Sequence, residues 1–208
     1  MIAQNKKAYL DRLYPSAVAA TKGSGILPDT LITQLVGESG WNLSKLAQTA
    51  NNFHGIKADP SWNGRVISAT TQEYNPATRR NETFVGTWKI YASRTDALKQ
   101  GANPVTLFRA FSSPVDGFKG YVNFLKSNPR YSAAFRVNTP AQQIVEIAKA
   151  GYATKPTYAN YLFDIYNGFK AYTSQLIKTL APAQPVKVSQ PIKEVSLLAA
   201  LIGFFFGR

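Results

Sequence analysis

The strongest constraint on the fold is a regular spacing of apolar residues near the end of the chain. After Tyr158 they recur at intervals of three or four residues, at Leu162, Ile165, Phe169, Tyr172 and Leu176. This is the period of an α-helix that buries one face. A chain of 208 residues is long enough for one domain with a buried core. The sequence therefore predicts a folded protein with a long amphipathic helix at the end of its domain.

Further helices are predicted on both sides of the middle of the chain. Apolar periodicity and helix-start residues indicate helices over 6–21, 28–37 and 43–51, the last with Ser44 as a candidate cap. After Pro114, a second set of apolar residues shares one helical face, namely Val115, Phe118, Val122 and Leu125. Thr139 and Pro140 are typical of the start of another helix.

Residues 55–111 have a different composition. Short stretches rich in Val, Ile, Thr and aromatic residues, at 65–71, 83–91 and 106–111, alternate with Asn, Gly and Pro. This alternation predicts a small antiparallel β lobe. The predicted fold class is α+β, a mostly helical body with a β lobe. A cleft between the two parts is a natural substrate groove.

The end of the chain is predicted to lie outside the main domain. Three prolines in residues 181–191 indicate an extended linker after a domain over 1–180. Residues 192–208 form a short hydrophobic segment whose uncharged run is shorter than the roughly 20 residues that span a bilayer as a helix. We expect residues 195–207 to dock on the domain itself, on a membrane surface or on a virion partner.

The charge is strongly positive. Lys and Arg number 24 against 11 Asp and Glu, which gives a formal net charge of +13. Basic residues occur throughout the chain and never in runs longer than a pair, whereas a nucleic-acid binder more often gathers them on one stripe or tail. The charge therefore favours attraction to a polyanionic surface such as a bacterial envelope. No nucleic-acid partner is expected.

The scarcity of two residue types narrows the chemistry. The chain has no cysteine and a single histidine, His54. These counts exclude disulfides, thiol nucleophiles and thiolate zinc sites. No metal cluster is visible in the sequence and no cofactor is expected, so carboxylates, tyrosines or amides must carry any reaction. Residues 1–13 lack a long apolar run, so no secretory signal peptide is expected.

Glu38 is the first catalytic candidate. It follows Leu31 and Leu35 by seven and three residues, so the apolar stripe of its helix ends in a carboxylate, with Trp41 close behind. Burial beside an indole would raise the pKa of the carboxyl and suit a general acid. The structural alternative is that the helix ends before Glu38 and the side chain points to water.

Several ordered blocks carry a resemblance to a known family. They are Gly37 to Ala47, Asn51 to Lys57, Phe108 to Phe111, Arg130-Tyr131 and Gly151 to Tyr158. The chain resembles glycoside hydrolase family 73, which includes endo-β-N-acetylglucosaminidases of bacterial autolysins and phage lysins. The likeness covers roughly residues 5–178. It implies a lysozyme-like fold and cleavage of the β-1,4 bond between N-acetylglucosamine and N-acetylmuramic acid in peptidoglycan.

The resemblance implies roles for three residues. The catalytic glutamate of the family falls on Glu38. The second acidic residue falls on Glu73, with Asp59 as its competitor, and the structural alternative for Glu73 is an exposed cross-strand charge. A tyrosine of the Gly151 block is needed for activity in the family, and we expect it to be Tyr152, in the turn before the last helix. The second catalytic role falls either to Glu73, activating water, or to the substrate's own N-acetyl group.

Other residues are candidates for binding the glycan. Trp41 and Tyr158 offer aromatic faces, although core packing is the commoner fate of such residues. Asn51 and Asn52 either close a turn or hold sugar hydroxyls. His54 stands between Phe53 and Gly55, where many family members have Phe followed directly by Gly. It is expected to line the floor of the groove.

The expected partner is a peptidoglycan strand at the bacterial cell wall. A lytic enzyme without a signal peptide resembles those released by phage lysis or carried on a particle. The rival class is a non-catalytic wall-binding or virion protein that keeps the fold.

Overall fold

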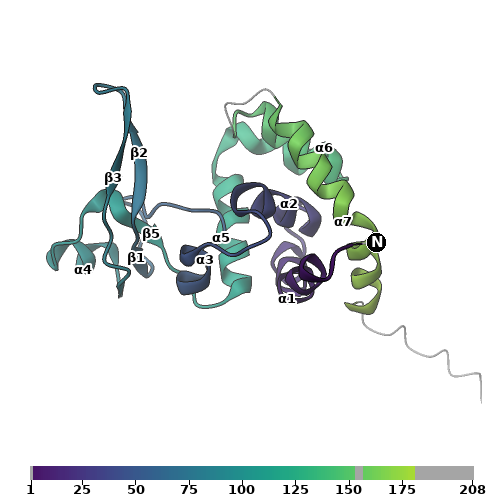
Figure 1. Cartoon of the computed structure of the whole chain (residues 1–208), viewed down its shortest axis with the longest axis horizontal. Helices are drawn as coiled ribbons and strands as arrows, with labels where there is room; N and C mark the ends of the chain where they lie inside the picture. The colour runs from purple at the N-terminus through teal and green to yellow at the C-terminus, as the bar shows by residue number, and fades with distance from the viewer. Residues whose placement is uncertain (1, 153–156, 181–208) are drawn as a thin grey trace, which may run out of the picture.

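The computed structural model describes residues 2–152 and 157–180, so the predicted linker 181–191 and the segment 192–208 lie outside the described residues. A helical body carries a β lobe that projects from it (Figure 1). The body consists of α1 (Gln4–Thr21), α2 (Pro28–Ser39), α3 (Lys45–Ala50), α5 (Pro114–Ser127), η2 (Pro129–Arg136), α6 (Pro140–Lys149) and α7 (Tyr158–Leu180). The lobe consists of β1 (Val66–Ser68), β2 (Thr71–Asn75), β3 (Arg80–Phe84), β4 (Ile90–Tyr91), α4 (Arg94–Lys99), η1 (Pro104–Thr106) and β5 (Leu107–Arg109).

The predicted helices are confirmed, with bounds that shift by a few residues. The Ser44 hydroxyl caps α3 by accepting a hydrogen bond from the Ala47 N–H at 3.1 Å. Thr139 caps α6 in the same way, through the N–H of Gln142. The apolar stripe of α7 faces the core, where Leu162 and Phe169 are buried. None of the helices in the described part of the chain is long and apolar enough to cross a membrane.

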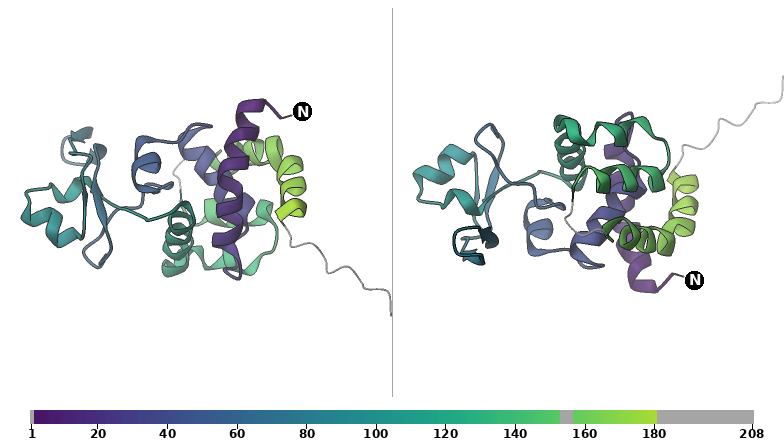
Figure 2. Two further views of the ribbon diagram at one scale, coloured as in Figure 1. Left: turned by 90° about the horizontal axis from the view of Figure 1, so that it is seen from below. Right: turned by 90° about the horizontal axis from the view of Figure 1, so that it is seen from above.

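Helix α2 lies at the centre of the body. Every residue from Thr30 to Val36 is buried, because α1, α6 and α7 all pack against this helix. The views from below and above show α1 crossing the body beside α5 and α7 (Figure 2). A helix buried on all sides is fixed in position by its neighbours.

Buried polar contacts fix the first turn of α2. The side-chain carbonyl of Gln143, on α6, accepts from the Leu27 N–H at 2.9 Å and from the Thr30 hydroxyl at 2.8 Å. Its amide group donates to the Gly25 carbonyl at 2.7 Å and to that of Ala134 at 3.2 Å. Gln143 has no exposed surface, so these bonds replace those it would make with water.

A carboxylate in the same turn joins three helices. Asp29 of α2 accepts hydrogen bonds from the hydroxyl of Tyr14, on α1, at 3.1 Å and from that of Thr173, on α7, at 2.6 Å. Burial raises the pKa of Asp29 above its usual value, and both hydrogen bonds oppose this rise. The start of α2 is thus held from α1, α6 and α7 at once.

The β lobe contains more elements than the sequence predicts. Antiparallel strands in the order β4-β1-β5 form one sheet, and β2 pairs with β3 as a separate hairpin. The predicted strand over 65–71 is divided between β1 and β2. The backbone of Gly86 crosses at this point, where a Cβ on Gly86 would lie 2.3 Å from the carbonyl carbon of Ala69. Helix α4 was not predicted, since six residues are too few to show a helical period.

Two passages of chain form a neck between the lobe and the body, namely residues 51–57 and 109–111. The Asn52 amide donates to the carbonyls of Ile56 and Arg109, both at 2.9 Å, and its side-chain oxygen accepts from the Ile56 N–H. The Asn51 amide donates to the Phe111 carbonyl at 3.1 Å. These bonds join the two passages to each other.

Helix α5 packs closely against the neck. A Cβ on Gly117 would lie only 2.0 Å from the carbonyl oxygen of Asn51. This contact requires glycine because any side chain would meet backbone atoms there.

Replacing Gln143 by Leu is expected to lower the free energy of unfolding by about 2–4 kcal/mol, because buried partners such as the Leu27 N–H and the Thr30 hydroxyl lose their hydrogen bonds. Urea unfolding followed by circular dichroism measures the change. Gln142, the exposed neighbour on α6, provides the control: Gln142→Leu should cost less than about 1 kcal/mol. Equal losses in the two variants would contradict a special role for Gln143.

Candidate active site

Glu38 lies in the last turn of α2, where the helix leaves the core. The helix continues to Ser39 and ends at Gly40, whose φ of 66° and N–H bond to the Val36 carbonyl terminate it. The helix therefore includes Glu38, as the apolar stripe from Leu31 and Leu35 implied, although the predicted range 28–37 ended one residue before it. The predicted burial of its carboxylate is wrong, because the Glu38 side chain is exposed. It is Gly37 that faces α7, where a Cβ would lie 2.6 Å from Leu162.

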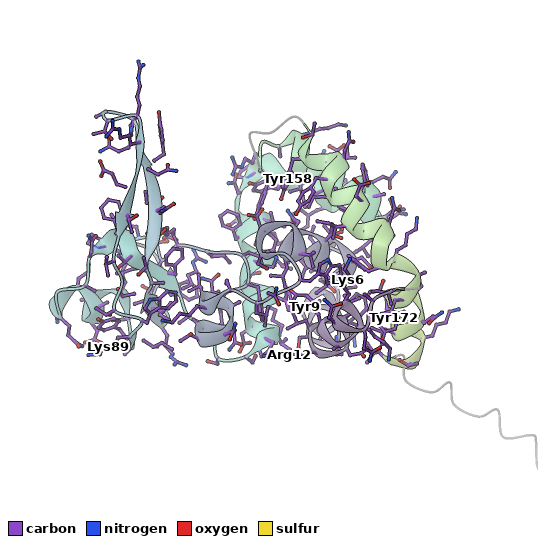
Figure 3. All side chains as sticks on the ribbon, in the orientation of Figure 1. Lys6, Tyr9, Arg12, Lys89, Tyr158 and Tyr172 are labelled. Atoms are coloured by element: carbon purple, nitrogen blue, oxygen red, sulfur yellow. The ribbon has the colours of Figure 1, made fainter. Side chains whose placement is uncertain are left out.

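Tyr158, the first residue of α7, contacts this carboxylate. Its hydroxyl donates a hydrogen bond to Oε1 of Glu38 at 3.0 Å, and Figure 3 shows Tyr158 above the ribbon of α2. Burial and, secondly, the negative charge of Glu38 raise the pKa of Tyr158 far above its usual value. Tyr158 is therefore a neutral donor that holds one oxygen of the carboxylate.

Tyr152, the expected catalytic tyrosine, is not the tyrosine that bonds to Glu38. Among the hydrogen bonds of the described residues, the one to Glu38 comes from Tyr158. The Tyr152 ring instead stacks on that of Tyr158, with centroids 6.0 Å apart, and its other side meets Tyr121 and Tyr131 at 6.2 Å. Burial raises the pKa of Tyr152 to about 12. Tyr152 thus supports the tyrosine that touches the carboxylate.

Glu73 lies on β2 in a polar setting of its own. Its Oε1 is 2.6 Å from the ammonium of Lys57 and accepts from the Thr71 hydroxyl at 2.9 Å. The hydrogen bond from Lys57 is the main cause of a lowered pKa, so Glu73 is ionised at neutral pH. Its other oxygen, Oε2, makes no hydrogen bond to the described residues and is free to accept one from water.

The competing carboxylate, Asp59, has both oxygens engaged. Its Oδ1 accepts from Ser61, and its Oδ2 pairs with the guanidinium of Arg109 at 2.6 Å. These hydrogen bonds lower its pKa to about 2. Asp59 therefore ties its loop to β5. This difference favours Glu73 over Asp59 as the second catalytic carboxylate.

The predicted glycan-binding residues separate into different roles. Asn52 is 1% exposed and closes the neck, as does Asn51, so the turn-closing alternative describes both. The Trp41 ring packs edge-on against Tyr9 and Phe169 at the edge of the core, yet it is only partly buried and lines a cavity, so its contact with sugar stays a prediction. An indole at that place is part of the helical body.

His54 lines a cavity between the neck and the body, and its predicted place on the floor of a substrate groove stays a prediction. Its ring stacks on Tyr121 with centroids 3.7 Å apart and planes 2° from parallel. Burial lowers the pKa of His54 to about 3, so the imidazole is neutral at physiological pH. A neutral ring stacked in this way contributes packing and no charge.

The cavity has a volume of about 390 Å³. Besides His54, its walls include Lys57, Asp59, Arg109, Arg130 and Tyr152. The basic residues were missed as site residues in the sequence, although Arg130 lies within a block that carries the resemblance. In the part of the chain that the structure describes, no group of three or more His, Cys, Asp or Glu side chains could hold a metal ion.

These observations together define the class of protein. An exposed carboxylate at the end of a buried helix, a tyrosine bonded to it and a β lobe carrying a second carboxylate are the parts of a lysozyme-like glycosidase. The sequence profile described as mannosyl-glycoprotein endo-β-N-acetylglucosaminidase matches residues 14–171. The chain belongs to this glucosaminidase family, glycoside hydrolase family 73.

Curated relatives and solved structures agree with this membership. The peptidoglycan hydrolase FlgJ of Vibrio parahaemolyticus is 32% identical over 76% of this chain and 46% of the relative, and that of Salmonella typhimurium is 31% identical over 86% and 51%. The chain thus spans about half the length of these relatives. A C-terminally truncated glycoside hydrolase domain of Salmonella typhimurium FlgJ is 30% identical, with a TM-score of 0.57 over 80% of this chain and 98% of that one.

Replacing Tyr158 by Phe is expected to reduce kcat on a glycan substrate about tenfold or more, because a hydrogen bond to a charged group is worth about 1.5–3 kcal/mol. Tyr152→Phe should have a smaller effect. The Tyr152 ring, which stacks on Tyr158, is kept in this variant, and the hydrogen bond to Glu38 comes from Tyr158. Steady-state kinetics of the two variants, with thermal unfolding as a check on folding, make the comparison. A greater loss for Tyr152→Phe would return the catalytic role to that residue.

Proposed function

We propose that this chain is a peptidoglycan hydrolase that cleaves the β-1,4 bond between N-acetylglucosamine and N-acetylmuramic acid. The observation that carries the proposal is the hydrogen bond from the half-buried Tyr158 to the exposed Glu38. It positions a solvent-facing carboxyl group at the end of a rigid helix, where a glycan can reach it. Membership of the glucosaminidase family and the relatives named peptidoglycan hydrolase support the substrate.

In this mechanism Glu38 is the general acid. It delivers a proton to the leaving O4 while positive charge develops at the anomeric carbon. The Tyr158 hydroxyl orients the carboxyl and stabilises the carboxylate that remains after transfer, since a hydrogen bond to the ionised form favours that form.

Glu73 performs the second role as an ionised base. The ammonium of Lys57 keeps it deprotonated, so its free Oε2 can accept the proton of an attacking water. Participation of the substrate's own N-acetyl carbonyl is the alternative for this step. In that case Glu73 orients the substrate and takes no proton.

The proposed place of action is the bacterial cell wall, to which a net charge of +13 would attract the protein through anionic envelope polymers. Bacteriolysis after phage release, or carriage on a particle, stays a prediction from the sequence. The same is true of a membrane or virion partner for residues 195–207.

Glu38→Gln should abolish the loss of turbidity of purified peptidoglycan, with a decrease in rate of at least about a hundredfold, because the proton donor is removed. Reducing-end analysis of wild-type fragments identifies the bond cleaved. The control is Glu146→Gln on α6, a carboxylate paired with Lys149 of the same helix. A wild-type protein that binds the wall without digesting it would instead support the non-catalytic class.

Glu73→Gln is expected to cause a large but incomplete loss of activity. Glu82 lies directly opposite Glu73 on β3 and supplies the matched control, because Glu82→Gln removes the same charge from the same hairpin. The two variants are compared in the turbidity assay. Wild-type behaviour of Glu73→Gln would favour participation of the N-acetyl group.

A further inference from the structure

The cavity beside the neck carries an unbalanced positive charge. Lys57 and Arg109, in its wall, are each paired with a carboxylate at 2.6 Å, Glu73 and Asp59 respectively. Arg130 lines the same cavity and makes no ion pair or hydrogen bond with the described residues. One exposed cationic group is therefore left without a protein partner among the described residues.

The Arg130 side chain is held in place although it is unpaired. Its guanidinium carbon lies 4.6 Å from the centre of the Tyr131 ring, and that ring is buried in the core. An arginine stacked on an aromatic face keeps its N–H groups available at the edge of the plane. Those N–H groups match the two oxygens of a carboxylate.

The cavity is linked to the catalytic residues through aromatic contacts. Tyr152 lines the cavity, and its ring lies 6.0 Å from that of Tyr158, which is bonded to Glu38. The cavity that Arg130 lines and the Glu38 carboxylate are therefore neighbours, connected through the Tyr152 and Tyr158 rings.

We propose that Arg130 binds a carboxylate on the lactyl branch of a muramyl residue and so determines specificity for muramyl glycans. This inference rests on the proposed function. N-Acetylglucosamine is neutral, whereas the muramyl residue carries a lactyl ether. That group ends in a free carboxylate in peptide-free strands and in a stem peptide with its own carboxylates in intact peptidoglycan. An arginine at this position distinguishes the two sugars by charge.

The test measures binding in a protein that does not cleave its ligand. Glu38→Gln and the double variant Glu38→Gln/Arg130→Gln are titrated calorimetrically with peptide-bearing glycan strands, amidase-treated strands and neutral chito-oligosaccharides. We expect the Arg130 change to weaken binding of at least one anionic ligand about tenfold or more. Binding of the neutral ligand should be unchanged. The anionic ligand that loses affinity identifies which carboxylate is bound.

A matched control comes from the same element. Arg136 is the last residue of η2 and lines a different cavity, so Arg136→Gln removes one charge without altering the proposed contact. It should leave all three affinities unchanged. Equal weakening by Arg136→Gln, equal weakening on the neutral ligand, or no effect of Arg130→Gln would each overturn the proposal.

A conservative variant covers the case in which Arg130→Gln fails to fold. Arg130→Lys keeps the charge and should give a smaller loss, confined to anionic ligands. A loss shared with the neutral ligand would overturn the proposal.

Digestion by the wild-type protein separates this inference from the proposed function. Selective binding of anionic strands without cleavage would contradict only the function.

Discussion

The burial of α2 from Thr30 to Val36 is the constraint on which the active site depends. Its first turn is held by Gln143 and Asp29, and its middle is enclosed by helices from both ends of the chain. The last turn reaches solvent, and that turn carries the exposed Glu38. Packing of the helical body around α2 therefore fixes the position of the helix end from which the Glu38 carboxylate projects. The precision expected of a catalytic group thus comes from residues that never contact substrate.

The helical part of this arrangement could be predicted because its signals are local. The spacing after Tyr158 and the capping positions at Ser44 and Thr139 all correspond to helices in the structure. The β lobe was predicted only in outline. Its strands are two to five residues long, and their ends depend on the crossing at Gly86, a contact between backbones that composition does not show.

The sequence predicted the two carboxylates of the candidate site, but not which side chains surround them. Glu38 ends an apolar stripe, which the sequence displays, but its exposure depends on where α7 stops covering α2. The choice between Tyr152 and Tyr158 depended on the direction of side chains at the start of α7, and the packing of Trp41 depended on α1. Lys57 became recognisable as the partner of Glu73 only once the loop and the hairpin were placed together.

The neck has a consequence for how the two carboxylates can approach each other. Asn52 binds both passages of chain, and α5 rests against the Asn51 carbonyl at Gly117. Because these bonds join the two passages to each other, the neck is one connected unit and not two separate segments. The lobe, with Glu73 on its β2–β3 hairpin, is thus connected to the body through one hydrogen-bonded neck. The placement of Glu73 relative to Glu38 therefore depends on an amide that touches neither carboxylate.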